Sequence, residues 1–305
     1  MSLDTLQSMH MFIRAVELGS FSSVAREEHT SQPTVSKVIA ALERDLEVRL
    51  LERTTTSLSL TAEGRLFYER SKRLLEEYND AVADVRGQTQ QFVGTLRVAA
   101  PVGLGELRLN TLIIEFLAKY PEIEIELILN DRVMDLTEEG FDIAIRLGGC
   151  LPPNVIARHI GSSPRILVAT PAYIKRNSSV RRPEDLVKHE YMQYAGLIAG
   201  SDLELVRGVE KIGVTVKGRY RVNNSLALRQ CLLEGIGLGS APAWLVQDLI
   251  DTGALIHLLP KWKLPSQPVH LVYPPNRLQP LRTRALLQFI SERILEVPGI
   301  VTPEV

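Results

Sequence analysis

Cysteine is scarce in this sequence, whose 305 residues include only Cys150 and Cys231. The two cysteines are far apart and form no CxxC pair, so the pattern predicts two reduced thiols and no disulfide framework. Long apolar runs are also absent, since none reaches the roughly 18 residues that span a bilayer. Asp4, Arg14 and Glu17 interrupt the apolar residues of the N-terminal segment, unlike those of a signal peptide. We therefore expect a cytoplasmic protein without a membrane partner.

No excess of charge of one sign marks the chain, which has 35 lysines and arginines against 36 aspartates and glutamates. Whole-chain electrostatics therefore give no support for a nucleic-acid partner, although a DNA-binding protein needs only a local basic patch. The length suits two or three domains. The hydrophobic fraction of 45% and the charged fraction of 23% are typical of a globular protein.

A recognisable set of catalytic or metal-binding residues is missing. The 6 histidines show no spacing typical of a metal site, and the sequence contains no GxSxG or Walker motif. The run from Gly235 to Gly239 resembles a phosphate-binding loop only weakly. Because it follows a helical pattern, we interpret it as a helix-to-strand turn. The sequence therefore predicts that the protein is not an enzyme and holds no metal or fixed cofactor.

What is present in the first sixty residues is a pattern of three short helices. Apolar residues recur at helical spacing from Leu6 to Val16, and Gly19 and Ser20 end that helix. Ser22 is the predicted cap of a second helix. Ser31 is the predicted cap of a third, with Pro33 in its first turn, where proline costs no backbone hydrogen bond.

The third helix has one apolar face and one small, polar face. The predicted buried stripe is Val35, Val38, Ile39, Leu42 and Leu46. The opposite face has no carboxylate, and its small and polar side chains suit a helix that enters a DNA major groove by its N-terminal end. The alternative is the solvated face of an ordinary three-helix domain. That face consists of Gln32, Thr34, Ser36, Lys37, Ala40, Ala41 and Arg44.

After the third helix the pattern changes to that of a small hairpin, because Leu58 and Leu60 alternate with polar residues. A hairpin beside a recognition helix is a wing. Arg49, Arg53 and the neighbouring Thr54 suit contacts to phosphates, which fix the register on DNA without reading its sequence.

A long helix is predicted to follow, with Thr61 as its cap and no proline as far as Gln90. Its narrow apolar stripe favours a partner helix, as in a coiled coil, although packing on its own chain is the alternative. The stripe consists of Phe67, Leu74, Tyr78, Ala81, Val82 and Val85. From Gly94 onward strand-like and helix-like stretches alternate, which is typical of α/β folds.

The N-terminal segments resemble, in order, the winged helix-turn-helix of LysR-type transcriptional regulators. The helix-turn-helix would begin near Phe21 and end near Ala40. By this resemblance Ser31, Gln32, Pro33, Thr34, Ser36 and Lys37 face the major groove, and Arg53 and Thr54 contact the backbone. The matching runs are Gly19-Ser20-Phe21-Ser22-Ser23-Val24-Ala25, Ser31-Gln32-Pro33-Thr34-Val35-Ser36-Lys37, Leu42-Glu43, Val48-Arg49-Leu50, Arg53-Thr54 and Leu60-Thr61-Ala62-Glu63-Gly64.

Three positions depart from the pattern of this family. Glu28 stands where the family usually has leucine, so we expect it to be exposed or paired. Glu47 stands where the family usually has glycine, so we expect it to adopt a left-handed backbone conformation. Leu51 stands where phenylalanine is usual.

The remainder of the chain resembles the LysR-type effector domain, through segments that include Gly94-Thr95-Leu96-Arg97-Val98 and Asp142-Ile143-Ala144-Ile145-Arg146-Leu147-Gly148. The resemblance implies a multidomain protein. An all-α winged helix-turn-helix (1–62) and a long linker helix (63–91) precede an α/β, two-lobed domain similar to periplasmic binding proteins (92–305). Lobe one would comprise about 95–161 and 270–305, and lobe two about 162–268. The crossover strands would lie near 160–165 and 267–269.

The function implied is that of a DNA-binding transcriptional regulator. Its partners would be double-stranded DNA carrying an interrupted palindrome, a small-molecule effector, a second copy of the chain, with dimers pairing further, and RNA polymerase. We consider two alternatives: a small-molecule binding protein whose N-terminal domain only dimerises, and an enzyme. Redox sensing by Cys150 and Cys231 is a further alternative.

A cleft between lobes is a common site for small molecules, so the residues that end strands are candidate effector contacts. Family members often have a hydroxyl near the position of Val102 to hold a carboxylate, and this chain has none there. Arg146 could supply a charge instead, although a salt bridge outside the cleft is the alternative for that residue. The candidates are Pro101, Val102, Gly103, Leu147, Gly148, Tyr194, Ala195, Asn223 and Ser240.

Overall fold

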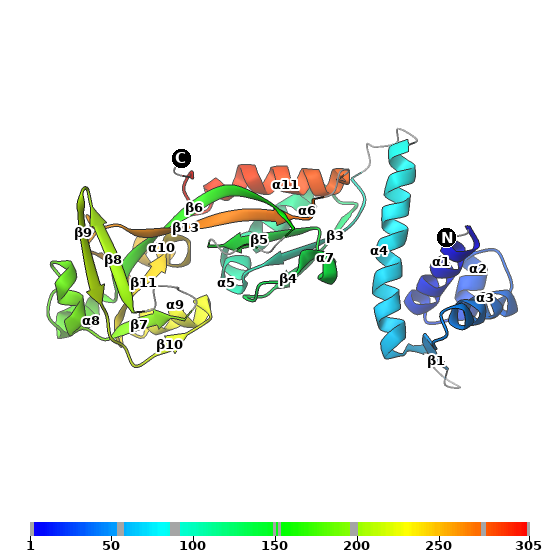
Figure 1. Ribbon diagram of the computed structural model, residues 1–305, viewed down its shortest axis with the longest axis horizontal. Helices are drawn as coiled ribbons and strands as arrows, with labels where there is room; N and C mark the ends of the chain where they lie inside the picture. The colour runs from blue at the N-terminus through cyan, green and yellow to red at the C-terminus, as the bar shows by residue number, and fades with distance from the viewer. Residues whose placement is uncertain are drawn as a thin grey trace. The chain divides into compact units, whose positions relative to one another are not determined.

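The computed structural model describes residues 3–53, 58–85, 92–148, 151, 154–195, 201–275 and 279–303. The chain divides into two compact units, Met1–Gln91 and Phe92–Val305. Each unit has a hydrophobic core of its own (Figure 1).

The first unit is a bundle of short helices with a small hairpin and one long helix. Its elements are α1 (Leu3–Leu18), α2 (Phe21–Glu27), α3 (Gln32–Asp45), β1 (Leu51–Arg53), β2 (Leu58–Leu60) and α4 (Ala62–Val85). Phe12, Val24, Val35, Ile39 and Leu50 are completely buried at its centre. The antiparallel pair β1–β2 has the register Leu51↔Leu60. This arrangement confirms the predicted helix-turn-helix with a hairpin after it.

The start of α4 is fixed by Thr61, as the sequence predicted. Its Oγ1 accepts a hydrogen bond from the Gly64 backbone N–H at 2.8 Å and donates one to the Arg49 carbonyl at 2.7 Å. The first bond satisfies a donor that a helix terminus otherwise leaves free. The second ties the helix to the segment that precedes the wing, so that α3, the wing and α4 form one connected structure.

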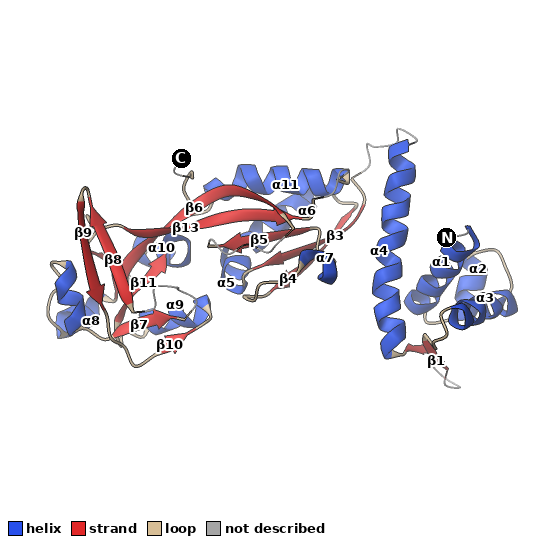
Figure 2. Cartoon of the chain, viewed as in Figure 1, coloured by secondary structure: helices blue, strands red, loops and turns tan. Residues whose placement is uncertain are grey.

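The second unit contains one curled, mixed sheet whose strand order is β10-β7-β11-β6-β13-β5-β3-β4, with β12 paired to β6 (Figure 2). Lobe one holds β3, β4 and β5, and lobe two holds β7, β10, β11 and β12. This confirms the predicted α/β class. The strands are β3 (Gly94–Ala100), β4 (Ile123–Leu129), β5 (Ile143–Leu147), β6 (Ile156–Ala169), β7 (Tyr191–Tyr194), β10 (Arg221–Val222), β11 (Leu238–Pro242), β12 (Ile256–Leu258) and β13 (Leu264–Tyr273).

Two long strands join the lobes. β6 and β13 run antiparallel to each other, with Val269 opposite Gly161 (Figure 1). β13 pairs with β5 of lobe one, and β6 pairs with β11 of lobe two. The predicted crossover segments, near 160–165 and 267–269, lie within these two strands.

Helices cover the sheet of the second unit. The largest core cluster lies under them and includes Phe116, Ile143, Ile145, Trp244 and Ile290. The helices are α5 (Val102–Leu104), α6 (Asn110–Lys119), α7 (Leu136–Glu139), α8 (Pro171–Arg176), α9 (Ser225–Leu233), α10 (Ala243–Asp251) and α11 (Leu281–Arg293), with a π-helical turn at Gly105–Leu109 and short 3-10 helices at Pro183–Lys188 and Ile294–Glu296.

A separate two-stranded hairpin was not anticipated from the sequence. It consists of β8 (Asp202–Arg207) and β9 (Glu210–Thr215) in lobe two. The Arg207 guanidinium lies 4.6 Å from the centre of the Trp262 ring, and this contact holds the hairpin against the segment before β13.

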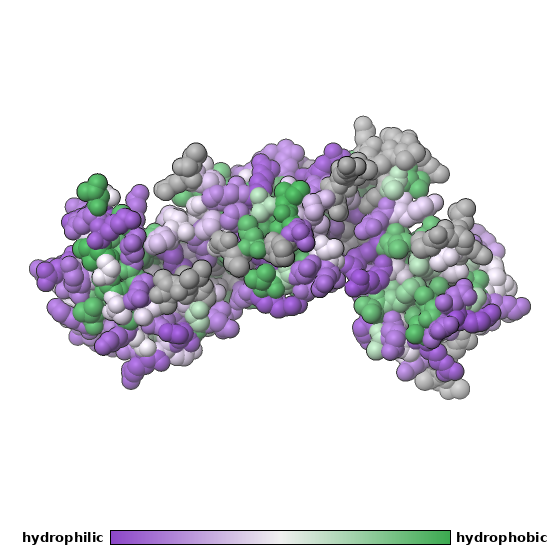
Figure 3. Space-filling view, viewed as in Figure 1, coloured by the Kyte–Doolittle hydropathy of each residue, from purple (hydrophilic) through white to green (hydrophobic). Residues whose placement is uncertain are grey.

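Hydrophilic residues cover much of the visible surface, with separate apolar areas between them (Figure 3). In the described parts of the chain, no helix has both the length and the apolar composition needed to cross a bilayer.

Candidate nucleic-acid interface and effector site

The start of α3 carries the residues proposed to face DNA. Ser31 is its N-cap, as predicted: its Oγ accepts a hydrogen bond from the Thr34 backbone N–H at 3.3 Å and lies 2.7 Å from the Thr34 hydroxyl. Pro33 lies in the first turn. Gln32, Thr34 and Lys37 are exposed, and Ser36 is half-buried. The first turn contains no acidic residue, so the positive end of the helix dipole is left available to an anion such as a phosphate.

The buried face of α3 is narrower than predicted. Val35, Ile39 and Leu42 are buried, as expected. Val38 is only half-buried and Leu46 is 37% exposed, so assigning both to the core was wrong. The helix ends at Asp45 and Leu46 is its C-cap, so the chain turns away before Leu46 can reach the core.

The turn after α3 has the backbone conformation predicted for Glu47, whose φ is 55°. A side chain in this left-handed region costs free energy that glycine would not incur. The turn is held by Glu43, whose Oε1 accepts hydrogen bonds from the backbone N–H groups of Leu50 at 2.8 Å and Leu51 at 3.1 Å. Glu43 therefore links α3 to the first strand of the wing.

The structure places Glu28 outside the core, in agreement with the expectation that it is exposed or paired. It is the C-cap of α2, and its Oε1 lies 3.3 Å from Nδ1 of His10. The cap of α2, however, is Ser20 and not Ser22. Gly19 has a left-handed backbone conformation and Ser20, which follows it, is extended. The Ser20 hydroxyl accepts a hydrogen bond from the Ser23 backbone N–H at 3.4 Å.

A polar network that the sequence did not indicate connects α1 to α2 and α4. The Arg14 guanidinium binds both carboxylate oxygens of Glu27, at 2.6 and 2.7 Å, and also contacts Glu17. The Tyr68 hydroxyl donates to Glu17 at 3.2 Å. Burial, together with the nearby Glu17 charge, raises the pKa of Tyr68 to about 12. This network fixes the orientation of α4 relative to the helix-turn-helix.

The apolar residues of α4 divide into two groups, which corrects the single stripe predicted from the sequence. Phe67 packs into the core of the unit, with its ring centre 5.6 Å from that of Phe12. Further along, Leu74 is 36% exposed and Tyr78 is 43% exposed. Ala81 is exposed and Val82 half-buried. Only the second group is therefore available to a partner helix. The side chains of Arg53 and Val85, and the whole of Thr54, lie outside the described residues.

In the second unit, the two lobes meet at Asp131, in the loop after β4. Its Oδ1 accepts a hydrogen bond from the backbone N–H of Val102, in the same lobe, at 3.0 Å. Its Oδ2 accepts one from Nδ2 of Asn224, in lobe two, at 3.1 Å. Asn224 is also the N-cap of α9, because its Oδ1 accepts the Ala227 N–H. Asn223, the candidate chosen from the sequence, is exposed beside it.

Close backbone packing accompanies this polar contact. A Cβ at Gly103 would lie 2.0 Å from Ser225 Oγ, at the start of α9, so the Ser225 side chain would have to move to admit a larger residue. The structure thus brings α5, with the candidates Val102 and Gly103, against α9 of lobe two. Gly148 follows β5, whose last residue is the half-buried Leu147, and its N–H donates to the Pro268 carbonyl of the crossover strand at 2.9 Å.

A second contact between the lobes is ionic. Arg108 Nη2 binds Asp248 Oδ1 at 2.8 Å, and Arg229 Nη2 binds Asp248 Oδ2 at 2.5 Å. The hydrogen bond from Arg229, followed by the charges of both arginines, lowers the pKa of Asp248. These residues are far apart in the sequence and belong to no motif, so no sequence signal pointed to them.

Of the remaining candidates, Tyr194 and Ala195 lie at the carboxyl end of β7, whereas Ser240 lies in the middle of β11 and does not end that strand, contrary to the prediction. Ser240 is buried, and its N–H donates to the Tyr191 hydroxyl at 3.0 Å. Nη2 of Arg165 donates hydrogen bonds to the carbonyl of Ser240 at 3.0 Å and to its hydroxyl at 3.2 Å. Tyr194 is half-buried, which raises its pKa, and Ala195 is exposed. Arg165 was missed by sequence reasoning, because nothing local shows that a strand arginine is buried.

Of the two interpretations of Arg146, the salt bridge is not found among the described residues, and the supply of a charge to the cleft stays a prediction. It is buried, and its Nη1 donates to the Arg132 carbonyl at 2.9 Å. No salt bridge to a carboxylate is found for it among the described residues, and its Nε and Nη2 have no hydrogen-bond partner. Burial lowers the pKa of Arg146.

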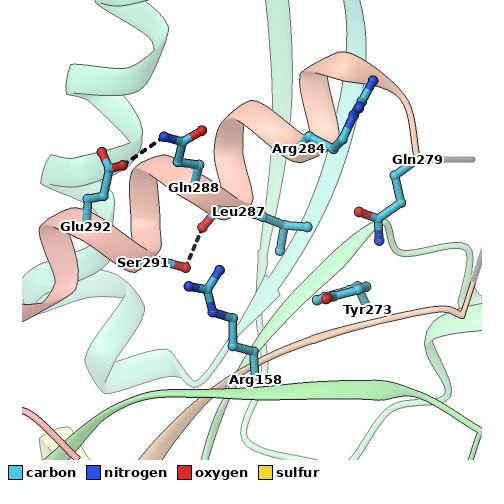
Figure 4. Close-up of a pocket in the computed structure, with 8 residues that line it drawn as sticks. All are labelled: Arg158, Tyr273, Gln279, Arg284, Leu287, Gln288, Ser291 and Glu292. Atoms are coloured by element: carbon cyan, nitrogen blue, oxygen red, sulfur yellow. Dashed lines mark hydrogen bonds between the residues drawn. The ribbon is translucent and has the colours of Figure 1, made fainter.

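Two cavities lie beside α11. One of about 470 Å³ is lined by residues that include Arg158, Tyr273, Leu287 and Ser291. In it the Arg158 side chain extends from β6 toward α11 (Figure 4). The other, of about 350 Å³, is lined by residues of α6 and α11.

Comparison with known proteins identifies both units. The bacterial regulatory helix-turn-helix protein, lysR family, matches residues 6–65, and the LysR substrate binding domain matches residues 89–294. The chain belongs to the LysR family of bacterial transcriptional regulators. It is 30% identical over 293 residues to the HTH-type transcriptional regulator PtxR of Pseudomonas aeruginosa, covering 96% of this chain and 94% of that one.

Solved structures agree with this assignment. The full-length Vibrio cholerae virulence activator AphB is 27% identical and superimposes with a TM-score of 0.59, covering 95% of this chain and 98% of that one. CrgA of Neisseria meningitidis is 28% identical with a TM-score of 0.60, covering 94% of this chain and 98% of that one. The LysR-type regulator is therefore a transcription factor with a DNA-binding helix-turn-helix and an effector-binding domain, and its relatives are regulators and not enzymes.

Of the two cysteines, the structure describes Cys231, whose surroundings do not favour a reactive thiolate. Cys231 is half-buried in α9, and burial raises the pKa of its thiol, which disfavours the reactive thiolate. Cys150 lies outside the described residues.

Proposed function

We propose that the protein acts as a dimer whose two helix-turn-helix heads bind an interrupted palindrome near promoters, and that a small molecule bound between the lobes controls it. The observation that carries this proposal is the exposed start of α3, where Gln32, Thr34 and Lys37 present an amide, a hydroxyl and an ammonium group. No carboxylate competes for DNA phosphates there.

Within each head, we assign base contacts and phosphate contacts to different residues. Gln32, Thr34, Ser36 and Lys37, with Ser31 and Pro33 shaping the first turn, would meet base edges in the major groove. The backbone contacts would come from Arg49, which is exposed, and from Arg53 and Thr54 in the wing.

The second half of α4 supports a dimer. Leu74 and Tyr78 are exposed apolar side chains, one helical turn apart, in a helix of 24 residues. Such a narrow stripe is stabilised when a second helix covers it. A dimer places two heads on one DNA molecule and so requires a site with two related halves. We further propose that dimers pair, and that the bound protein contacts RNA polymerase in the cytoplasm.

The effector would act through the contacts between the lobes. A ligand can shift the arrangement of the lobes only if it binds one arrangement better than another. Asp131, whose carboxylate joins Val102 to Asn224, lies where a ligand would alter that balance. The residues proposed to line the effector site are Pro101, Val102, Gly103, Leu147, Gly148, Tyr194, Ala195, Asn223 and Ser240.

A nuclease footprint of the full-length protein on the DNA upstream of its own gene and of neighbouring genes tests the proposal. We expect a protected region with two related half-sites, about one or two helical turns apart. Lys37→Ala should abolish the protection, whereas Lys211→Ala, an exposed lysine of the β8–β9 hairpin, should leave it intact. A single unpaired half-site, or equal protection by the Lys37 variant, would contradict the proposal.

A further inference from the structure

We propose that the cavity of about 470 Å³ beside α11, which we call the α11 cavity, is a second ligand site and binds a small organic dianion. Its volume is within the range of sites that hold small molecules. None of its lining residues is among the candidates for the effector site between the lobes. A ligand bound here would therefore be additional to one bound between the lobes.

The α11 cavity is formed by three elements that are far apart in the sequence. β6 contributes Arg158, β13 ends at Tyr273, and α11 contributes Leu287. Arg158 lies opposite Leu271 in the β6–β13 ladder, so the two crossover strands together form one wall. The Arg158 side chain extends from this wall toward α11, while Tyr273 and Gln279 lie together at the other end (Figure 4). The site is thus a product of the tertiary structure.

The charges of the α11 cavity favour an anion. Two arginines line it, Arg158 and Arg284, and neither forms an ion pair with a carboxylate in the parts of the chain that the structure describes. The carboxylate of Glu292 also lines it, but already accepts a hydrogen bond from the Gln288 amide at 2.8 Å (Figure 4). Arg293, on the same helix, is by contrast 2.8 Å from a glutamate carboxylate. The cavity therefore offers two guanidinium groups to a ligand.

Neutral groups complete the site. The Tyr273 hydroxyl and the Gln279 amide form no hydrogen bond with another described residue, so both can donate to an anion. The Ser291 hydroxyl already donates to the Leu287 carbonyl at 2.6 Å, so it offers a ligand only its lone pairs. The ring of the half-buried Tyr273 and the side chain of the buried Leu287 would contact the carbon part of the ligand.

Two guanidinium groups favour a ligand with two negative charges. The planar donors of arginine match the oxygens of both carboxylates and phosphates. Arg158 comes from β6 and Arg284 from α11, so a dicarboxylate can place one group on each, and the phosphate of a monoester can be bound by both. A monoanion would leave one of the two arginines without a counter-charge. The chemistry shared by the two sources is a dianion with a small carbon part.

The position of the α11 cavity connects such a ligand to the geometry of the domain. β6 and β13 continue from lobe one into lobe two, whereas α11 packs against α6 and β3 of lobe one. A dianion that joins Arg158 to Arg284 would hold the crossover strands against lobe one. We therefore expect slower hydrogen exchange in these strands and in α11 when the ligand is bound.

Thermal unfolding of the full-length protein tests the ligand class, in Tris chloride at about pH 8, where phosphate monoesters carry two charges. The probes are succinate, 2-oxoglutarate, phthalate, glycerol 3-phosphate and phenyl phosphate. Butyrate and benzoate are the matched monoanions, and sodium chloride at equal ionic strength is the blank. We expect at least one dianion at about 10 mM to raise Tm by about 2 °C or more above the blank, and the monoanions to raise it by less.

The two groups of probes separate a dicarboxylate from a phosphate monoester as the source of the dianion. If no dianion raises Tm above the blank, or if a monoanion of similar size acts equally, the proposal is wrong.

Variants then test the residues. Arg158→Gln and Arg284→Gln should each weaken binding of the active dianion by about tenfold or more, because each removes one charge-assisted contact. Arg158→Lys should retain part of the binding. Both arginines are exposed, so Tm without ligand should stay near that of the wild type. The matched control, Arg181→Gln, removes an exposed arginine of lobe two and should bind as the wild type does.

Unchanged binding in Arg158→Gln and Arg284→Gln would overturn the site. An equal loss in Arg181→Gln would also overturn it, because it would show a general attraction of anions to surface charge.

Hydrogen exchange of the full-length protein, with and without the active dianion, locates the bound ligand. We expect protection of residues 156–160 and 281–292, and no change around Val102 and Asn224, where the lobes meet. This readout involves no DNA, so it is independent of the proposed function. Protection confined to Val102 and Asn224 would place the dianion between the lobes and overturn the assignment.

Discussion

Asp131 and Asn224 join the two lobes through a single hydrogen bond, with Nδ2 of Asn224 at 3.1 Å from Oδ2 of Asp131. Each residue also forms a hydrogen bond within its own lobe, because Asp131 accepts one from the Val102 N–H and Asn224 caps α9.

Asp131→Ala should lower the free energy of unfolding by about 1–2 kcal/mol, since it leaves the Val102 N–H and the Asn224 amide without their acceptor. Urea unfolding measures this change. Glu138→Ala, which removes an exposed carboxylate from α7, is the control and should change little.

Gln32→Ala tests the assignment of a base contact. If Gln32 reads one base edge, the variant should lose about 1–3 kcal/mol of binding to the correct sequence and discriminate less at that one position. Gel-shift titrations on the wild-type site and on singly substituted sites measure this. Gln247→Ala, in α10 of the other unit, should bind as the wild type does. Equal losses on every sequence would show that Gln32 does not read a base.

Arg53→Ala tests the phosphate contact of the wing. Removing one phosphate contact should weaken binding to all sequences alike and reduce the slope of log K against log salt concentration by about 0.9. Binding isotherms at several salt concentrations give this slope. A change of specificity without a change of slope would assign Arg53 to a base instead.

Glu47→Gly should stabilise the first unit, because Glu47 holds a φ of 55°. Glycine adopts this conformation without strain, so we expect a gain of about 0.5–1 kcal/mol in the free energy of unfolding. Asp45→Gly is a matched control two residues earlier, in the last position of α3. It should instead lose about 0.3 kcal/mol, because glycine is only slightly less favourable than aspartate in a helix. Denaturant unfolding of the full-length variants, followed by circular dichroism, compares the two.

Acid should weaken the ionic contact between the lobes. Arg229 and Arg108 lower the pKa of Asp248 from its ordinary value of 3.8, so its contribution to stability is present above that value. The contribution is lost as pH falls through the lowered folded-state pKa. Asp248→Asn should thus be less stable than the wild type at pH 7, and the difference should shrink below pH 3.8. Tm measured against pH checks this, and a constant difference would exclude the ion pair as its cause.

Local sequence patterns predicted most of the helices and caps of the first unit. The 3.6-residue spacing, the capping hydroxyls of Ser31 and Thr61 and the unusual Glu47 each act within a few neighbouring residues, so they were predictable. The errors were also local but depended on backbone angles. Ser20 rather than Ser22 caps α2, because Gly19 turns the chain two residues earlier than predicted, and Leu46 is exposed because α3 ends before it.

In the second unit, the alternation of strands and helices predicted the α/β class, and the resemblance to the LysR-type effector domain implied the two crossover strands. Only the tertiary structure decided which side chains meet between the lobes. Asp131 with Asn224, and Asp248 with Arg108 and Arg229, are joined across long stretches of chain, and no periodicity encodes such contacts. The same holds for Arg165. Its residue type is visible in the sequence, but its burial, with no carboxylate partner among the described residues, depends on strands and loops that fold around it. The sequence alone thus determined the family and the helix-turn-helix, whereas the burial and pairing of individual charges in the second unit depend on contacts that only the tertiary structure makes.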